Sequence, residues 1–568
     1  MSSTRSFLLL ALLAVSYFLY QAWEQDYGPK SAAPTAAAGT NSSTPTTASG
    51  ANDVPAAAAA ASATATAAAA PTGDAAQNPA AQTITITTDV LRVAISTAGG
   101  SVVRADLLAY PIDPKDKTQP VRLLEEGNPH YFVAQTGLVS NGAAAPNHKA
   151  LFHAEKSSYE LADGSDKIEV PLTWTDASGI SVRKIYVFTR GSYLVETREE
   201  VTNASAAPWV GNEYRQLQRT APPTVSGGLF AVYNPEAYAF VGAAWYAQGK
   251  FNKLPFAKYA ESPLNNTEVS GGWIALLQHY FFAAFIPAAG EADQYSTTTI
   301  TTDGAPRYMI RAMSSAQTIA PNATGTFATR LYIGPKLQSD LANVAPGLDL
   351  TADYGILTFI AQPMHWVLVQ LHKLTGNWGV AIILLVLLIK LLLYKPSEAQ
   401  YRSMAKMKQF QPRLEALKER YGDDKQKLNT AMMELYKKEK INPLGGCLPI
   451  LIQMPIFFAL LWVLQESVEL RQAPFFGWIQ NLSAPDPLFI LPILNGVAML
   501  ATQWISPMSP NMDPMQQRMM KFMPLIFAVM FAFAPAGLTL YWTVNGWLSL
   551  LQQWIITKRI GAAVPAKA

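Results

Sequence analysis

A single lysine, Lys390, lies within an otherwise apolar run at 380–394. An ionisable group inside a membrane helix costs a few kcal/mol or more, and such groups usually mark functional sites. The alternative is that Lys390 lies near the end of its helix and extends to water, because Tyr394, Lys395 and Pro396 begin only about 6 Å of helical rise further on. Helical side chains lean toward the N-terminus of their helix, which here is toward the middle of the membrane. The residue types therefore favour a functional cation.

The last apolar segment, 537–556, has a polar stripe. At about 100° per residue, its small and polar side chains fall within one arc of about 120°. They are Thr539, Trp542, Thr543, Gly546, Ser549 and Gln553. Such a stripe must face protein or water, and it also occurs in ordinary contacts between membrane helices. Because amide groups at Gln453, Asn495 and Gln503 add polarity on the preceding segments, we expect a water-containing cavity near Lys390.

The sequence lacks the motifs of several other chemistries. It has no phosphate-binding G-x-x-x-x-G-K-S/T loop and no G-x-S-x-G nucleophile elbow. Its six histidines are scattered, and His365 and His372 have no acidic or thiol neighbour in the sequence. We therefore expect no catalytic residue, no metal and no cofactor, so the chain is not predicted to be an enzyme. A small-molecule or ion transporter is the alternative function, but it would need coupled ionisable residues, of which only Lys390 is evident.

The elements that must position these residues are apolar segments in a chain of mixed composition. Half of its 568 residues are hydrophobic and 15% are charged, which lies between soluble and membrane proteins. Apolar segments that approach the length of about 20 residues needed to cross a bilayer lie at 7–20, 378–394, 447–465, 488–505, 522–534 and 537–556. We predict an α-helical polytopic membrane protein with six transmembrane helices. Residues 1–27 are predicted to be an uncleaved anchor, because no small-x-small cleavage site follows the first segment.

A large non-membrane portion separates the first apolar segment from the others. Residues 28–82 are mainly Ala, Thr, Ser, Pro and Gly, which cannot bury a core and predict a disordered linker. Residues 83–345 alternate apolar and polar side chains between turn motifs, which predicts an all-β sandwich domain. The clearest strand signals lie at 83–87, 90–95, 167–174, 180–188, 295–301 and 328–333. Residues 346–377 are predicted to include an amphipathic helix at the membrane interface.

The distribution of lysine and arginine predicts the orientation. Twelve basic residues lie between the second and third apolar segments, whereas 466–487 contains only Arg471. The segment 396–441 and both termini, including a short tail at 559–568, are therefore predicted to be cytoplasmic. The β domain is predicted to be external, in the periplasm of a host with two membranes. The single cysteine, Cys447, excludes an intramolecular disulfide.

The cytoplasmic segment 396–441 is predicted to be a helical hairpin. Ser397 and Asp423 each begin a capping-box pattern, so two helices should start there, with a turn at Gly422 and a kink at Pro412. The basic face of the hairpin is either solvated or a docking surface for an RNA-rich or acidic partner such as a ribosome. The positive-inside bias alone already explains the lysines.

Several motifs resemble the YidC membrane protein insertases of the YidC/Oxa/Alb family. They are AQY at 399–401, SMAKM at 403–407, GDDKQ at 422–426, NPLGGCLP at 442–449, LIQMPIF at 451–457, SVELRQAP at 467–474 and DPMQQ at 513–517. The resemblance is dense over 349–558, and the anchor with an external β domain is similar to the Gram-negative branch.

The resemblance implies a core of five transmembrane helices, 378–558, around a hydrophilic groove that opens to the cytoplasm and to lipid. Lys390 occupies a position where the family usually has arginine, so the charge is kept but the guanidinium fork is lost. Together with the polar stripe, the resemblance predicts a substrate groove of Lys390, Gln503, Tyr541, Trp542, Thr543 and Asn545. It also implies an adjacent apolar slide for substrate helices, formed by Met454, Phe457, Phe458 and Phe527.

The function that the resemblance implies is that of a membrane protein insertase and chaperone in the bacterial inner membrane. Its expected partners are nascent membrane proteins, the Sec translocon with its accessory subunits, the ribosome and membrane lipids. No sequence-specific binding to nucleic acid is expected.

Overall fold

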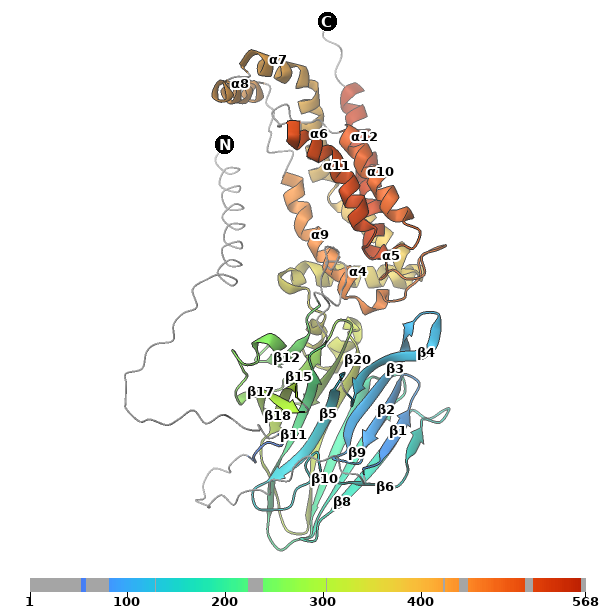
Figure 1. Cartoon of the computed structure of the whole chain (residues 1–568), viewed down its shortest axis with the longest axis vertical. Helices are drawn as coiled ribbons and strands as arrows, with labels where there is room; N and C mark the ends of the chain where they lie inside the picture. The colour runs from blue at the N-terminus through green and yellow to red at the C-terminus, as the bar shows by residue number, and fades with distance from the viewer. Residues whose placement is uncertain are drawn as a thin grey trace, which may run out of the picture. The chain divides into compact units, whose positions relative to one another are not determined.

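A computed structural model describes residues 53–57, 81–127, 129–222, 239–302, 304–421, 424–438, 448–505 and 514–562. The predicted anchor at 1–27, nearly all of the linker at 28–82 and the final residues of the tail lie outside these ranges. Figure 1 shows the strands, which extend to Pro335, and the helices that follow them.

The strands form two antiparallel sheets, apart from one short parallel pairing between β1 and β7. The eleven-stranded sheet contains, in order, β14 (Thr267–Ser270), β17 (Ala292–Thr302), β18 (Ala305–Ser314), β11 (Trp209–Thr220), β5 (Phe132–Ser140), β4 (Asp116–Glu125), β3 (Ser101–Asp113), β2 (Leu91–Ser96), β1 (Thr83–Thr87) and β7 (Ser158–Glu160), with β19 (Gln317–Ile319) beside β11. The nine-stranded sheet contains β13 (Lys250–Pro255), β12 (Gly242–Ala247), β15 (Trp273–Leu277), β16 (Phe281–Pro287), β20 (Ala323–Pro335), β10 (Leu194–Asn203), β9 (Ile180–Thr189), β8 (Lys167–Thr175) and β6 (His153–Ala154).

The alternation of side chains places one face of each strand in the core, as predicted. In β1, Ile84 and Ile86 are buried while Thr83 and Thr85 are exposed, because successive strand residues point to opposite faces. These isoleucines join Val170, Leu172 and other apolar side chains of the second sheet in one core. A large all-β domain is thus confirmed. Strand β20 begins earlier than its sequence signal because its first residues pair with the end of β10.

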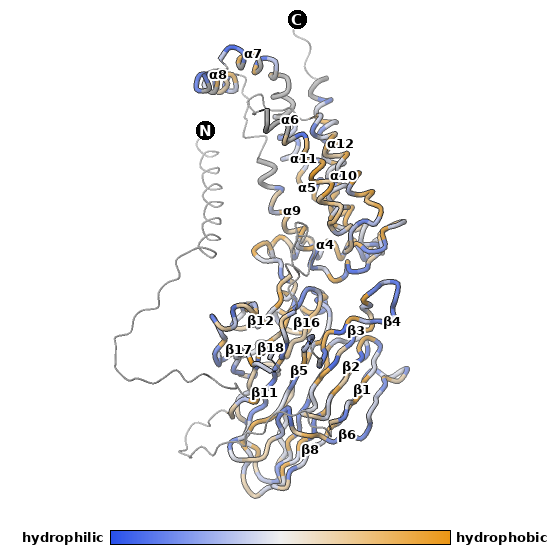
Figure 2. The backbone as a smooth tube through the Cα atoms, viewed as in Figure 1, coloured by the Kyte–Doolittle hydropathy of each residue, from blue (hydrophilic) through white to orange (hydrophobic). Residues whose placement is uncertain are grey.

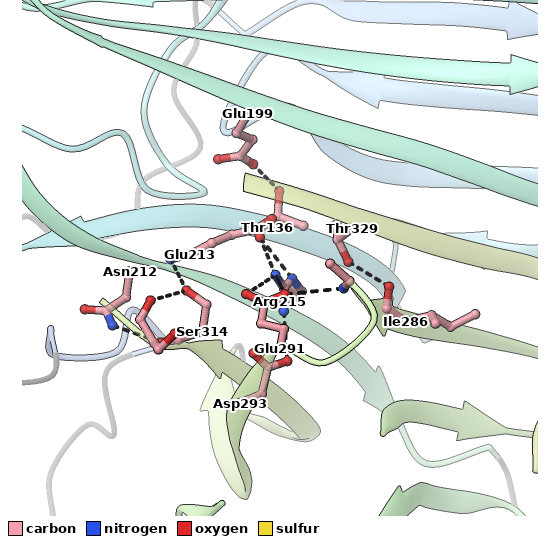
Figure 3. A network of polar contacts seen from close by, with 12 residues as sticks. Thr136, Glu199, Asn212, Glu213, Arg215, Ile286, Glu291, Asp293, Ser314 and Thr329 are labelled. Carbon is pink, nitrogen blue, oxygen red and sulfur yellow. Dashed lines mark hydrogen bonds and ion pairs between the residues drawn. The ribbon is translucent and has the colours of Figure 1, made fainter. Parts of the chain in front are cut away.

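Charged side chains are also buried in this domain (Figure 3). Arg215 lies 2.6 Å from Glu213, 2.8 Å from Asp293 and 3.0 Å from Glu291. Three carboxylates therefore share one guanidinium. Burial raises the pKa of Glu213 to about 8 and that of Asp293 to about 6, with Arg215 opposing the rise in both. The arrangement favours a protonated Glu213 at neutral pH.

Ten α-helices follow or flank these strands in the described residues. They are α3 (Gln338–Val344), α4 (Thr358–Thr375), α5 (Trp378–Leu392), α6 (Tyr394–Gln409), α7 (Gln411–Tyr421), α8 (Lys425–Lys438), α9 (Leu448–Glu466), α10 (Ile490–Ile505), α11 (Pro514–Phe531) and α12 (Ala536–Ala562). Helix α12 contacts α5, α6, α9 and α10 (Figure 1). Helices α5 and α10 are strongly apolar, whereas α7 and α8 are mostly hydrophilic (Figure 2).

The helical hairpin predicted at 396–441 differs from its prediction at the first helix start. Helix α6 begins at Tyr394, so Ser397 lies inside the helix, where its N–H donates to the carbonyl of Leu393. A helix that continues from the preceding turn leaves no free N–H group for a serine cap to satisfy. The helix breaks between Gln409 and Gln411, just before Pro412. Asp424 caps α8 by accepting from two backbone N–H groups of its first turn. The predicted turn at Gly422 and the predicted cap at Asp423 lie outside the described residues.

Among the described residues, no single helix combines the length and the mean hydropathy expected of a helix that crosses a bilayer. One bent pair, Trp378–Leu392 with Tyr394–Ser403, meets both criteria together with a bend of 65°. Ile490–Ile505 and Lys521–Phe531 are shorter apolar helices. The predicted number of six membrane spans is therefore not confirmed and stays a prediction.

Candidate functional site

Lys390 lies at the wall of a cavity of about 230 Å³ between α5, α6, α9 and α12. The side chain is half-buried on the last turn of α5. Of the predicted groove residues, the cavity brings together Lys390, Tyr541, Trp542 and Asn545. Two residues of the predicted apolar slide, Met454 and Phe457, line it as well.

A serine on the last helix holds the ammonium group of Lys390. The Lys390 Nζ donates to Ser549 Oγ at 2.6 Å, and the serine hydroxyl donates to the carbonyl of Asn545 at 2.6 Å. The Tyr401 side chain also forms a hydrogen bond with Ser549. In the part of the chain that the structure describes, Lys390 forms no ion pair with a carboxylate. None of the three N–H donors of the ammonium therefore has a charged partner there, and the one partner present is a neutral hydroxyl.

The polar stripe of α12 is divided between two environments. Trp542 and Ser549 of the stripe line the cavity, together with Asn545 beside them. Thr543 is buried and donates to the carbonyl of Leu491 on α10 at 3.1 Å and to that of Thr539 at 2.8 Å. Thr543 thus joins two helices and does not line the cavity. The amide of Gln453, from α9, forms a hydrogen bond with Tyr541 at the cavity wall.

An aromatic row extends from the cavity across three helices. The ring of Phe457 lies 5.1 Å from that of Phe458 and 4.8 Å from that of Trp542. Trp542 in turn lies 5.1 Å from Phe531, whose ring is 6.3 Å from that of Phe527. Phe458 and Met454 are exposed, at 40% and 43%. The predicted slide residues on α9 and α11 are therefore connected through Trp542, although Phe458 and Phe527 do not line the cavity itself.

Gln503 does not line this cavity. It is half-buried near the end of α10. The cavity is also lined by Leu393, which follows α5, and by Pro396, Ser397, Gln400 and Tyr401 of α6. The four residues of α6 were not predicted to belong to the site, because 396–441 was predicted to be a separate cytoplasmic hairpin, whereas Leu393 lay within the predicted span 378–394. The 65° bend after α5 brings α6 against α12.

The described residues contain no group of three or more His, Cys, Asp or Glu side chains that could hold a metal ion. His365 has an acidic neighbour that its local sequence did not reveal: its Nε2 lies 3.6 Å from Glu469, beyond hydrogen-bond distance. Glu469 follows α9, so the pairing depends on how α4 packs against α9.

Comparisons with known proteins agree over almost the whole chain. A family model for the YidC periplasmic domain matches residues 83–367, and one for the 60Kd inner membrane protein matches 370–563. A membrane protein insertase YidC of Thioalkalivibrio sulfidiphilus is 47% identical over 570 residues, which cover 99% of each chain. One from Stenotrophomonas maltophilia is 48% identical over 580 residues, covering 100% of this chain and 98% of that one.

A solved structure described as an active YidC insertase with its first transmembrane domain resolved aligns with 83% of this chain and 92% of that chain. The sequence identity is 18% and the TM-score is 0.35. The assignment to a family rests on the sequence matches. The chain belongs to the YidC membrane protein insertase family.

Proposed function

We propose that this protein inserts nascent transmembrane segments from the cytoplasm into the bacterial inner membrane, and that the cavity around Lys390 receives the short polar or acidic flank of each segment. The observation behind this proposal is a half-buried cation that is held by a serine hydroxyl and has no carboxylate partner among the described residues. A cation neutralised by the protein itself would attract an incoming carboxylate far less.

The cavity reduces the cost of moving a polar flank out of water. Transfer of a polar group into hydrocarbon costs several kcal/mol when no hydrogen bond compensates for it. Hydroxyl and amide groups of Tyr401, Gln453, Asn545 and Ser549 surround Lys390 and offer such bonds. Two unit charges about 4 Å apart attract by about 4 kcal/mol in a medium of intermediate polarity. Lys390 thereby acts as an electrostatic attractant rather than as a catalyst.

The aromatic row gives the apolar part of the client a path into lipid. Met454 and Phe458 expose apolar surface on α9 beside the cavity, and Phe527 lies at the other end of the row on α11. A client helix that slides along these side chains keeps its apolar face out of water. The hydrophobicity of the client and the membrane potential supply the energy of insertion.

Partners and orientation complete the proposal. Both termini and the hairpin of α6, α7 and α8 lie in the cytoplasm, where the basic hairpin meets the ribosome and its nascent chain, and the β domain lies in the periplasm. The Sec translocon and its accessory subunits, together with membrane lipids, complete the set of partners. The concentration of basic residues in one segment supports this orientation.

The test is insertion of a small client with an acidic flank into vesicles that contain the purified protein. Lys390→Ala is expected to slow insertion about tenfold, which corresponds to about 1.4 kcal/mol of lost attraction, and Lys390→Glu more strongly because it repels the flank. Lys373→Ala removes an exposed lysine of α4 and serves as the matched control. Equal insertion with and without the protein would reject the insertase function. Normal insertion by both Lys390 variants would reject the role of the charge.

A further inference from the structure

A second cavity, of about 250 Å³, lies at one end of the β sandwich. Its wall includes Phe132 on β5 and Arg219 on β11, which are paired across neighbouring strands of the eleven-stranded sheet. Gln278, in the turn that follows β15 of the other sheet, also lines it. The cavity is thus built from both sheets and is separate from the site around Lys390.

Arg219 is a cation without a polar partner in the described part of the chain. Its guanidinium carbon lies 5.0 Å from the centre of the Phe132 ring. Its Nη1 is buried and has no hydrogen-bond partner among the described residues. Burial lowers the pKa of Arg219 to about 10, so the group remains charged at neutral pH. The residue as a whole is half-buried, but a buried N–H donor of a charged group that lacks a partner is costly, and a bound anion would compensate for it.

The remaining charges of the cavity neutralise each other. Arg122 donates to Asp106 at 2.9 Å and to Glu125 at 2.9 Å. Among the described arginine and carboxylate side chains that line the cavity, this leaves the guanidinium of Arg219 without a charged partner. His130 also lines the cavity, and Glu125 disfavours a ligand with two negative charges. The ligand charge that fits this balance is a single negative charge.

The wall of the cavity is preformed. Thr220, next to Arg219, donates through Oγ1 to the carbonyl of Pro129 at 2.9 Å and accepts from the backbone N–H of Tyr131 at 3.2 Å. Its backbone N–H donates to the carbonyl of Tyr131 at 2.9 Å. These bonds hold the segment between β4 and β5 against the end of β11. A preformed wall lowers the entropic cost of binding a ligand.

We propose that this cavity binds a small monocarboxylate with an apolar body. The planar guanidinium can hold a carboxylate through two parallel N–H···O bonds. Leu123, Phe132 and Pro222 supply apolar wall for the body of the ligand, and the side-chain amide of Gln278 supplies a further polar contact. The volume lies just below the range of about 300–1,000 Å³ that is usual for drug-sized ligands, so the occupant is a small molecule rather than a polypeptide segment.

Isothermal titration of the full-length protein in detergent with benzoate, benzamide and inorganic phosphate tests the proposal. Benzoate is expected to bind with one-to-one stoichiometry. Benzamide, which has the same shape without the charge, is expected to bind at least about tenfold more weakly, and phosphate more weakly than benzoate. Equal binding of benzoate and benzamide, tighter binding of phosphate, or no binding of benzoate would each overturn the proposal.

Variants locate the site. Arg219→Met is expected to abolish benzoate binding without lowering the thermal unfolding temperature, because it removes an uncompensated buried charge. Arg219→Lys keeps the positive charge but loses the planar guanidinium with its two parallel N–H donors. This variant should therefore bind benzoate with intermediate affinity. Arg183→Met is the control, since Arg183 is 52% exposed on β9.

Gln278→Ala leaves Arg219 in place and covers the case in which Arg219→Met does not fold. It is expected to weaken benzoate binding severalfold. Unchanged affinity in the Arg219 and Gln278 variants alike would show that benzoate binds elsewhere and would reject the site.

Discussion

Lys390 differs from an ordinary buried cation in the kind of partner that it has. A carboxylate partner would neutralise it, whereas the hydroxyl of Ser549 only orients it. The side chain could still have extended to water from the last turn of α5. Its contact with Ser549 instead directs it toward α12 and the cavity. At the scale of single residues, the function proposed here therefore depends on a weak internal partner that a client carboxylate can supplement.

Ser549→Ala tests this dependence. Without the hydroxyl, Lys390 loses its fixed position, and insertion of an acidic-flanked client is expected to slow about threefold, in keeping with the loss of one hydrogen bond of 0.5–1.5 kcal/mol. The readout is the insertion rate in reconstituted vesicles. Thr502→Ala is the control, because Thr502 bonds only to the backbone of its own helix. A variant as fast as the wild type would mean that Ser549 does not position the charge.

Glu213 predicts how the stability of the β domain depends on pH. Its pKa rises from 4.5 to about 8 on folding, so the folded state binds more protons than the unfolded state in that window. Stability must then fall as the pH rises through the window. Asp293 has the same sign but only between 3.8 and about 6. Burial lowers the pKa of His148 from 6.5, which gives a contribution of the opposite sign that ends near pH 7, so the fall in stability above that pH is assigned to Glu213.

Calorimetry of the full chain should show that the free energy of unfolding of the β domain falls between pH about 6 and about 8, by an amount on the order of 1–3 kcal/mol. Glu213→Gln should flatten this slope, because glutamine keeps a neutral partner for Arg215. Glu169→Gln, at a largely exposed carboxylate, should leave it unchanged. A wild-type transition that stays constant or rises over this interval would contradict the assignment of Glu213.

At the scale of elements, the start of α5 fixes where Lys390 can lie. Asn377 caps the helix by accepting from the N–H of Val380 at 3.1 Å. Its amide also donates to the carbonyl of Phe475 at 2.7 Å, which ties α5 to the segment after α9. Gly379 lies beneath the ring of Phe475, where an added Cβ would come within 2.0 Å of a ring carbon. A side chain at this position cannot fit without moving the ring or the helix.

Gly379→Ala is therefore expected to destabilise the helical core by about 1–3 kcal/mol, the usual cost of overpacking. The unfolding temperature of the purified protein in detergent measures the effect. Gly546→Ala is the matched control on α12. There an added Cβ would lie 3.4 Å from that of Ala498, an ordinary contact, and alanine favours the helix. An equal response of the two variants would remove the packing argument.

Local patterns predicted the ends of several strands better than they predicted the start of α6. The strands β1, β8 and β9 begin and end within about one residue of their sequence signals, because alternation and turn residues are local properties. The predicted helix start at Ser397 was wrong, because the bend after α5 continues directly into α6. The same bend places Tyr401 of α6 at the wall of the cavity. Such features depend on how two helices pack against each other, and a short stretch of sequence does not show this.

At the scale of the whole molecule, the orientation can be tested through the single cysteine of the chain, Cys447. In a Cys447→Ala background, Ser178→Cys places a thiol in the exposed turn between β8 and β9, and Thr430→Cys places one on the exposed face of α8. An impermeant maleimide should label the first in intact spheroplasts and the second only after lysis. The reverse labelling pattern would overturn the proposed orientation.

The sequence by itself determined the classes of structure in this protein and the family to which it belongs. Apolar runs, strand alternation and long motifs are local patterns, so they can be recognised in the sequence without knowing how the elements pack. Only the tertiary structure decided which polar groups meet. It directed Lys390 to Ser549, turned Thr543 toward α10, and left Arg219 without a polar partner in the described residues. These outcomes depend on contacts between segments far apart in the chain, and the geometry of such contacts is set by the packing of whole helices and sheets.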